Sequence, residues 1–367
     1  MTQIQIPSGM RDILSDECMI KDRLKSKIMA VYESYGYRQI ETPLIEFYST
    51  YQNTFTALKE ETLYKFVDES GQLLALRTDM TLPIARVTAG KYASDNLPLR
   101  FCYCSNVYKV RQSFAGKRNE VTDCGVELIG LDDSSDVEVL SCALDVMAAL
   151  GAEKYTLEIG SSELFRLACE KSGIDTEKAA VLADLIDRKE IPALKEYLKT
   201  LSLSIEADRF FNALPLLGGK EALENAMKLC FDEDLREEIS HMITLRDILS
   251  ELGYGDRVTF DLGKVPHLEY YTGIIFEGYA EGIGTSVLSG GRYDTLLSKL
   301  GRDLPAIGFG VKLDYLLDIM SSEKSEITKL YYPKDQIASA MKKARELRKT
   351  EPVEMIPREA GEMEVVR

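Results

Sequence analysis

The sequence predicts an α+β protein in which a mostly antiparallel sheet is flanked by helices. Three observations support this fold class. Patterns typical of strands recur up to about residue 160 and resume at residue 257, whereas residues 161–252 carry only helical patterns. The charged run SSEKSE at 321–326 is typical of a linker. We therefore expect one domain over 1–320, with a helical insertion at about 161–252, and a short C-terminal segment over 321–367.

The chain begins with an amphipathic helix. Ser15 can cap residues 15–35, and the acidic residues that follow it suit the positive end of the helix dipole. The apolar stripe of this helix consists of Ile20, Leu24, Ile28, Val31 and Tyr35. Gly36 follows as a stop signal, and the run YRQIETPLIE predicts a strand that Pro43 ends.

Strands and helices then alternate. The run LYKFVDESGQLLALRTD (63–79) predicts two strands around a Glu-Ser-Gly turn, followed by a helix that Asp79 or Thr81 starts. LPLRFCYCSNVYKV and EVTDCGVELIG predict two long strands joined by the polar loop RQSFAGKRN, and so a large antiparallel hairpin. A helix over 134–150, stopped by Gly151, and the short strand YTLEIG complete this part.

Strand patterns resume after the helical insertion. We expect strands near 257–261, 272–278 and 285–289, a helix at about 291–300, a strand at 306–311 and a helix to about 320. The C-terminal segment carries one strand-like piece, KLYYP, and one helix, QIASAMKKARELRK. That is too little for an independent domain of ordinary size.

Composition excludes several classes of protein. The net charge of −15 and the sequence pI of about 4.9 weigh against nucleic-acid binding, which depends on Lys and Arg contacts to phosphates. The start has no basic region followed by an apolar stretch, and no run approaches about 18 apolar residues, so we expect a cytoplasmic protein that contacts no membrane. The seven cysteines follow no metal-ligand spacing and there are only two histidines. We expect reduced buried thiols, no metal and no cofactor.

Seven short motifs occur in an order that resembles the class II aminoacyl-tRNA synthetase fold. They are PSGMRDIL, GYRQIETPLIE, LRTDMT, NVYKV…GKRNEVTDCGVELIG, LEYYTGIIFE, GGRYDTLL and PAIGFGVKLDYLL. The sequences of these motifs are most similar to those of histidyl-tRNA synthetases, over about residues 5–320. The second, fourth and last resemble motifs 1, 2 and 3 of that class. The resemblance implies a homodimer core, because motif 1 builds the dimer interface in the family.

Three positions depart from the cation pattern of that family. Adenylate formation needs cations around the ATP phosphates, because negative charge builds on the α-phosphate. The resemblance puts the motif 2 arginine at Lys109, which keeps the charge but loses the bidentate fork. It puts two further arginines at Pro266 and Tyr315, which carry no charge. Since loss of one preorganised donor lowers a rate by about 10²–10³, we expect almost no adenylation.

The amino-acid half of the site is closer to the family pattern. By resemblance, Asp79 and Thr81 hold the α-ammonium group of bound histidine, and Asp123 matches a glutamine that does the same. Glu127 and Tyr271 match residues that hold the imidazole. An acceptor and a phenol on either side of an imidazole can recognise both of its nitrogens. The resemblance therefore implies a histidine site with no catalytic residues.

Several further residues near these motifs are candidates for contacts with the ligand. Tyr270 is expected to brace the pocket, and Lys109 is the remaining candidate for the carboxylate of the ligand. Arg292 contacts either the ligand or a neighbouring carboxylate, and Gly290 and Gly291 permit either close packing or backbone contact with a ligand. The basic residues of the motif 2 loop are expected in solvent rather than at an anion or partner site, and they are Arg111, Lys117 and Arg118.

The C-terminal segment favours a regulatory function. Histidyl-tRNA synthetases end in a full anticodon-binding domain, whereas about 45 residues follow the linker here. A protein with this fold that recognises an amino acid, but neither forms an adenylate nor binds a tRNA anticodon, resembles the ATP phosphoribosyltransferase regulatory subunits. This resemblance implies a non-catalytic subunit that activates the short-form catalytic subunit in a hetero-oligomer and mediates feedback by L-histidine at the first step of histidine biosynthesis. The alternatives are a divergent or truncated histidyl-tRNA synthetase, and a free-standing amino-acid sensor or ligase-like protein.

Overall fold

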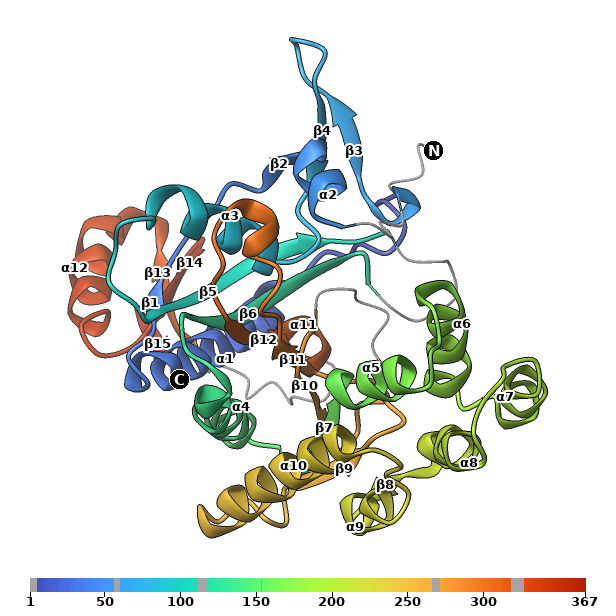
Figure 1. Ribbon diagram of the computed structural model, residues 1–367. Helices are drawn as coiled ribbons and strands as arrows, with labels where there is room; N and C mark the ends of the chain where they lie inside the picture. Colours follow the sequence, from blue (N-terminus) through green and yellow to red (C-terminus); the bar gives the residue numbers. More distant parts are fainter. Residues whose placement is uncertain (1–4, 56–59, 111–117, 153, 266–270, 318–326) are drawn as a thin grey trace. The chain divides into compact units, whose positions relative to one another are not determined.

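The computed structural model describes the chain except for six segments, which are 1–4, 56–59, 111–117, 153, 266–270 and 318–326 (Figure 1). The chain divides into two compact units, Met1–Met320 and Ser321–Arg367. Each unit has its own sheet and its own hydrophobic core. In the part of the chain that the structure describes, no helix is long and apolar enough to cross a membrane.

A nine-stranded mixed sheet lies at the centre of the larger unit. Its order is β1-β5-β6-β12-β11-β10-β7-β9-β8. The strands are β1 (Arg38–Gln39), β5 (Leu99–Tyr108), β6 (Glu120–Ile129), β7 (Tyr155–Ser161), β8 (Gly218–Gly219), β9 (Val258–Asp261), β10 (Ile274–Ala280), β11 (Leu288–Arg292) and β12 (Ala306–Lys312). Only the β1–β5 and β7–β9 pairs are parallel within this described sheet. The expected α+β fold is confirmed.

Strands β5 and β6 form the long hairpin that the sequence predicts. Their antiparallel pairing is continuous, and it places Ser105 opposite Asp123 and Phe101 opposite Glu127. Side chains alternate between the two faces of a strand, so Asp123 and Glu127 face the same side and Cys124 faces the other. Cys124 lies in the main core, whereas the carboxyl groups lie on the face that carries the candidate site.

Two helices, α1 (Ser15–Ser34) and α4 (Asp136–Ala149), cover the core face of the sheet. The buried residues of α1 include Leu24 and Ile28 of the predicted apolar stripe, and also Tyr32, which the stripe does not contain. The Tyr32 hydroxyl donates a hydrogen bond of 2.9 Å to the carbonyl oxygen of Cys124, which fixes α1 on β6. This packing leaves the opposite face of β6, β12 and β11 available for the site.

A three-stranded sheet stands beside the main one, in the order β2-β4-β3 (Figure 1). It consists of β2 (Ile45–Phe47), β4 (Leu73–Leu76) and β3 (Lys65–Val67), and it adjoins α2 (Tyr48–Thr54) and α3 (Thr81–Lys91). The strand that the sequence predicts before Pro43 is present but short, since β1 ends at Gln39, and the residues after the proline form the separate strand β2. Pro43 lies in the gap, has no N–H to donate to a ladder, and instead has its carbonyl oxygen near the guanidinium of Arg77.

Helices dominate the region between β7 and β9. They are α5 (Ser162–Lys171), α6 (Thr176–Asp187), α7 (Ile191–Leu198), α8 (Ile205–Ala213), α9 (Ala222–Met227) and α10 (Glu233–Glu251). Four of them begin at a residue whose side-chain oxygen accepts a backbone N–H, and these capping residues are Ser161, Asp175, Ser204 and Asp232. The two-residue strand β8 interrupts the helices and adds to the edge of the sheet beside β9.

The smaller unit contains more strand than the sequence predicts. Helix α12 (Ile337–Leu347) connects β13 (Thr328–Pro333) to the parallel strand β14 (Val353–Arg358), and β15 (Glu364–Val366) pairs with the other side of β13. The expectation of one strand and one helix missed β14 and β15, because a proline and several charged residues hide their strand pattern. Leu330, Tyr332, Ala340, Ala344 and Val353 form the core of this unit.

Two further expectations are wrong. The helix expected at 291–300 is absent from this described segment, which contains the end of β11 and a 3₁₀ turn over Ser298–Leu300. The backbone N–H of Tyr293 bonds to the carbonyl of Ala306, so it is not available to a helix. The expected reduced state is wrong for one cysteine pair, because Cys104 and Cys124 lie opposite each other across β5 and β6 and form a disulfide.

Candidate ligand-binding site

The floor of the candidate site is a glycine-rich stretch of β11 and β12. Gly291 pairs with Gly308, which pairs in turn with Glu127 on β6. A Cβ atom at residue 308 would overlap the Glu127 carboxylate, and one at residue 310 would overlap that of Asp123. The glycines therefore let two acidic side chains lie flat across β12.

Glu127 is the most enclosed acidic group of the site, with 1% of its surface exposed. Its Oε1 accepts a hydrogen bond of 2.8 Å from the Thr81 hydroxyl, and its Oε2 accepts a short one from the Tyr293 hydroxyl. Burial raises the pKa of Glu127 to about 8, although these two hydrogen bonds act in the opposite direction. At neutral pH this carboxyl group can both donate to and accept from a ligand nitrogen, because both protonation states are populated.

Asp123 lies on the same face as Glu127, four residues away along β6. Burial raises the pKa of Asp123 to about 7, and the charge of Lys312 partly offsets this effect. Within the described part of the chain, its Oδ1 is buried without a hydrogen-bond partner. An acceptor that is buried and unpaired costs about 1–3 kcal/mol, so a cationic ligand group at this position would be favourable.

Asp79 and Thr81 reach the site from the beginning of α3. Oδ1 of Asp79 accepts the backbone N–H of Leu82 at 3.0 Å, and its Oδ2 accepts the Thr78 hydroxyl at 3.0 Å. Helix α3 thus begins at Thr81, one of the two predicted starts, and Asp79 accepts an N–H of its first turn. The negative charge of Asp79 raises the pKa of both Asp123 and Glu127. The structure thus brings together four of the residues that the sequence nominates, which are Asp79, Thr81, Asp123 and Glu127.

Tyr271 lies at the other side of the floor. A Cβ atom at Gly291 would lie 2.8 Å from its ring, so the ring rests on the glycine. The following residue, Thr272, donates its N–H to the carbonyl of Arg292 at 2.8 Å, which holds this segment along β11. Tyr270, the other half of the tyrosine pair, lies outside the described residues.

Lys109 occupies the far end of the hairpin. Its backbone N–H bonds to Asn119, one residue beyond the last pair of β5 and β6. That position is four residues further along β5 than Ser105, which lies opposite Asp123. Four residues of extended strand span roughly 13 Å, so the backbone of Lys109 lies well away from the Asp123 carboxylate.

Arg292 binds acidic neighbours on the core face of the sheet. It is 4% exposed and contacts Asp136 at 2.5 Å and Asp294 at 3.0 Å. Of the two alternatives left open by the sequence, the structure therefore supports the neighbouring carboxylate. Arg118 is half-buried rather than solvated, with its guanidinium bonded to the backbone of Asp314 and lying over the Tyr315 ring.

The sequence analysis missed two residues of this site. Tyr293 follows Arg292 in the GGRYD motif and binds Glu127, and Lys312 is paired in register with Asp123. The period-2 alternation of β12 could have indicated Lys312, because it shares a face with Gly308 and Gly310. Tyr293 gave no such signal, since its contact with Glu127 joins residues far apart in the chain.

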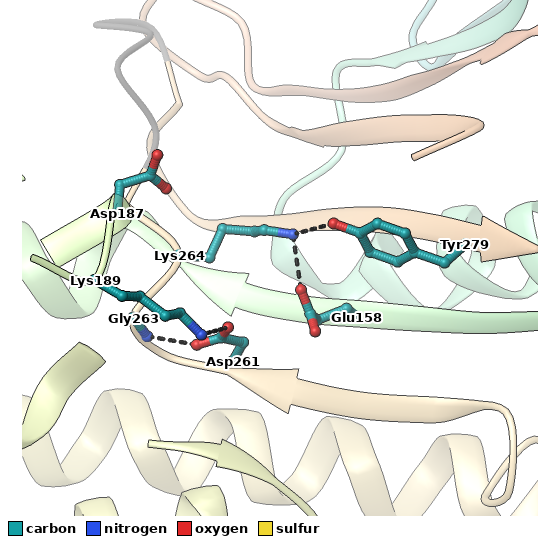
Figure 2. A pocket seen from close by; sticks show the side chains of 7 residues that line it. All are labelled: Glu158, Asp187, Lys189, Asp261, Gly263, Lys264 and Tyr279. Carbon is teal, nitrogen blue, oxygen red and sulfur yellow. Dashed lines mark hydrogen bonds and ion pairs between the residues drawn. The ribbon is translucent and has the colours of Figure 1, made fainter. Parts of the chain in front are cut away.

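A second cavity, of about 430 Å³, lies on the same face beside β7 and β9 (Figure 2). Lys264 occupies its centre and contacts Glu158 at 2.8 Å and Tyr279 at 3.2 Å. Lys189, which follows α6, bonds to Asp261 of β9 at 2.8 Å. The Lys189–Asp261 ion pair ties the helical region to the sheet. Across all residues with described positions, no group of three or more His, Cys, Asp and Glu side chains could hold a metal ion.

Comparison with known proteins gives consistent matches. The family model described as Histidyl-tRNA synthetase matches residues 9–316. An ATP phosphoribosyltransferase regulatory subunit from Clostridium kluyveri is 36% identical over 353 residues, which cover 94% of this chain and 90% of that protein. One similar structure, from Bacillus halodurans, is described as an ATP phosphoribosyltransferase regulatory subunit/histidyl-tRNA synthetase. The match has a TM-score of 0.87 and 33% sequence identity, and it covers 97% of this chain and 93% of that chain. Histidyl-tRNA synthetase from Nostoc, with a TM-score of 0.79, 21% identity and coverage of 98% and 88%, shares the fold.

Proposed function

The chain belongs to the ATP phosphoribosyltransferase regulatory subunits, which share the histidyl-tRNA synthetase-like fold, and we propose that it activates the short-form catalytic subunit and transmits feedback inhibition by L-histidine. The observation that carries this proposal is the environment of Glu127. It is a buried carboxyl group fixed by Thr81 and Tyr293 beside the acidic pair Asp79 and Asp123. Such a site suits a ligand that carries both an ammonium group and a ring with nitrogen donors and acceptors.

In this proposal, the acidic end of the floor receives the ammonium group of histidine. Asp123 supplies the unpaired oxygen, and Asp79 adds negative charge from the start of α3. The imidazole lies between Glu127 and Tyr271, with Tyr270 bracing it and Lys109 at the end of the hairpin. Gly308 and Gly291 let the two groups that flank the ring, the Glu127 carboxylate and the Tyr271 ring, lie close to the sheet.

The chain's own adenylation activity is expected to be negligible. The motif 3 position that carries arginine in the synthetases is Tyr315 here, which is 7% exposed and packed in the main core. Lys109 keeps one cation, but a lysine lacks the planar fork that grips two phosphate oxygens. The enzyme activity of the complex therefore resides in the catalytic subunit.

Feedback requires that histidine bind one state of the complex better than another. A site formed by α3, β6, β11 and β12 links elements from distant parts of the larger unit. Closing it on a ligand would couple these elements, and through them the surface that contacts the catalytic subunit. We propose a homodimer of this chain as the core of a cytoplasmic hetero-oligomer, with neither nucleic acid nor membrane as a partner.

The alternative function is that of a divergent histidyl-tRNA synthetase, which the family-model match favours. The two functions differ in one assay, histidine-dependent exchange of pyrophosphate into ATP. The regulatory proposal predicts exchange at background level for this chain alone. Exchange at the rate of an ordinary synthetase would overturn it, and turnover by the catalytic subunit with and without this chain tests it positively.

A further inference from the structure

We infer that Lys312 binds the α-carboxylate of the amino-acid ligand, an inference that rests on the proposed histidine site. Lys312 is the last residue of β12 and pairs in register with Asp123 on β6. Registered neighbours on antiparallel strands have Cβ atoms about 4.5–5.5 Å apart. A cation and an anion therefore stand side by side at one end of the floor, which matches the two charges of a free amino acid.

The direction of the Lys312 side chain follows from the strand. Residues 308, 310 and 312 alternate with core residues and share the ligand face of β12. The first two are glycines, so Lys312 is the one of these three residues that carries a side chain on this face. It is half-buried, which strengthens its interaction with a charged ligand group relative to an exposed lysine.

Neighbouring groups hold the side-chain ammonium group of Lys312 at this end of the floor. The Nζ atom of Lys312 lies 3.4 Å from the hydroxyl of Ser286. Its charge also lowers the pKa of Asp123, against the larger effect of burial, and that of Glu277, where Lys264 contributes more. Lys312 is thus placed between carboxylates of β6 and β10 before any ligand binds.

The length of the floor fits a small zwitterion. Glu127 and Asp123 are four residues apart on β6, roughly 13 Å between their backbones, and Lys312 lies opposite the second. The imidazole then lies at Glu127, and both charged groups of the ligand lie at the end formed by Asp123 and Lys312.

Lys109 is the competing candidate, because the sequence nominates it for the same carboxylate. Its backbone lies beyond the end of β5, about four residues past the level of Asp123. The two lysines have the same charge and length, so Lys109→Met is a matched control for Lys312→Met. Lys312→Arg keeps the charge and shows whether the cation itself is required.

The test compares two ligands by calorimetric titration, L-histidine and L-histidinol. Histidinol keeps the ammonium group and the imidazole but has no carboxylate. The titrations are made near pH 8.5, above the pKa of about 7 of Asp123, because loss of Lys312 raises that pKa. We expect Lys312→Met to weaken histidine binding about 10–100-fold and to change histidinol binding less than about 3-fold, as for loss of one charge-assisted hydrogen bond.

Each other outcome overturns the inference in a distinguishable way. Equal losses for both ligands in folded Lys312→Met would mean that Lys312 only positions Asp123. A selective loss of histidine binding in Lys109→Met, with Lys312→Met unchanged, would assign the carboxylate to Lys109. Unchanged histidine binding in both variants would show that neither lysine binds the carboxylate of the ligand. If the unaltered protein binds neither ligand at millimolar concentration, the proposed histidine site fails, and this inference fails with it.

Discussion

Tyr293 donates a hydrogen bond to Oε2 of Glu127, although 166 positions separate the two residues in the chain. The contact joins the residue after β11 to the C-terminal part of β6 across the intervening strand β12. It fixes one oxygen of the carboxyl group while Thr81 fixes the other. Glu127 is therefore held in one orientation before a ligand arrives, which reduces the entropy lost on binding.

Tyr293→Phe tests this arrangement. The phenylalanine keeps the packing but leaves Oε2 of Glu127 without its donor, so the carboxyl group is less fixed and its pKa rises further. We expect histidine affinity to fall about 5–30-fold, and the free energy of unfolding to fall by about 1–2 kcal/mol. Calorimetric titration and urea unfolding measure the two effects. Tyr279→Phe, which removes a hydroxyl from the second cavity, is the control and should leave histidine affinity unchanged.

The raised pKa values of Asp123 and Glu127 predict a pH dependence of stability. Unfolded carboxyl groups titrate near pH 4, whereas the folded values are about 7 and about 8. Between these limits the folded state binds more protons than the unfolded state, so the free energy of unfolding falls as pH rises. The contribution is complete below about pH 4 and is lost by about pH 8, and at roughly 1.4 kcal/mol per pKa unit it amounts to several kcal/mol for each group.

Urea unfolding of Asp123→Asn isolates this effect. The amide does not titrate, so the variant should gain stability relative to the unaltered protein as pH rises from about 5 to about 9. Asp256→Asn makes the same change at an exposed position and serves as the control for the change of residue type. A pH-independent difference for Asp123→Asn would contradict the burial of this group.

Gly310→Ala tests the glycine floor. The added Cβ would occupy the position of the Asp123 carboxylate, which must then move. We expect histidine affinity to fall at least about 10-fold, and stability to fall by about 1–3 kcal/mol from overpacking. At Gly284 nothing lies within 4 Å of an added Cβ, so Gly284→Ala is the matched control. Equal binding by the two variants would show that the floor does not position Asp123.

Asp136→Asn tests the support beneath the site. The Asp136–Arg292 pair is buried on both sides, with side-chain exposures of 2% and 4%, and it anchors the end of β11 next to Tyr293. Removing the charge of one partner leaves the other charge uncompensated. The free energy of unfolding should therefore fall by about 3–5 kcal/mol, as measured by thermal or urea unfolding. Glu163→Gln removes an exposed ion pair with Arg166 and should cost less than about 1 kcal/mol. A similarly small effect at Asp136 would be inconsistent with the buried pair.

Local patterns predicted the elements whose partners are near in sequence. The β5–β6 hairpin follows from two apolar runs around a polar loop, and α1 follows from its stripe and from Gly36. The predictions that failed concern segments whose backbone pairs with distant parts of the chain. The segment after Gly291 has a sequence compatible with a helix, but its backbone N–H groups bond to Ala306 and Thr272 instead.

The same distinction holds for the site. Asp79, Thr81, Asp123 and Glu127 were nominated by resemblance to motifs, and the structure places them together. Lys312 acquires its position through register with β6, and Tyr293 acquires its contact through the order β6-β12-β11. Neither relation can be obtained from one sequence without knowing how the strands pair.

Reconstitution with the short-form catalytic subunit of the same organism tests the central claim most directly. Turnover of ATP and phosphoribosyl pyrophosphate is measured with and without this chain, and L-histidine is titrated into both. The account predicts that this chain raises turnover and that histidine lowers it, and that Glu127→Gln still activates but responds only to higher histidine concentrations. If both folded proteins are present and this chain changes neither turnover nor its response to histidine, the regulatory function is contradicted.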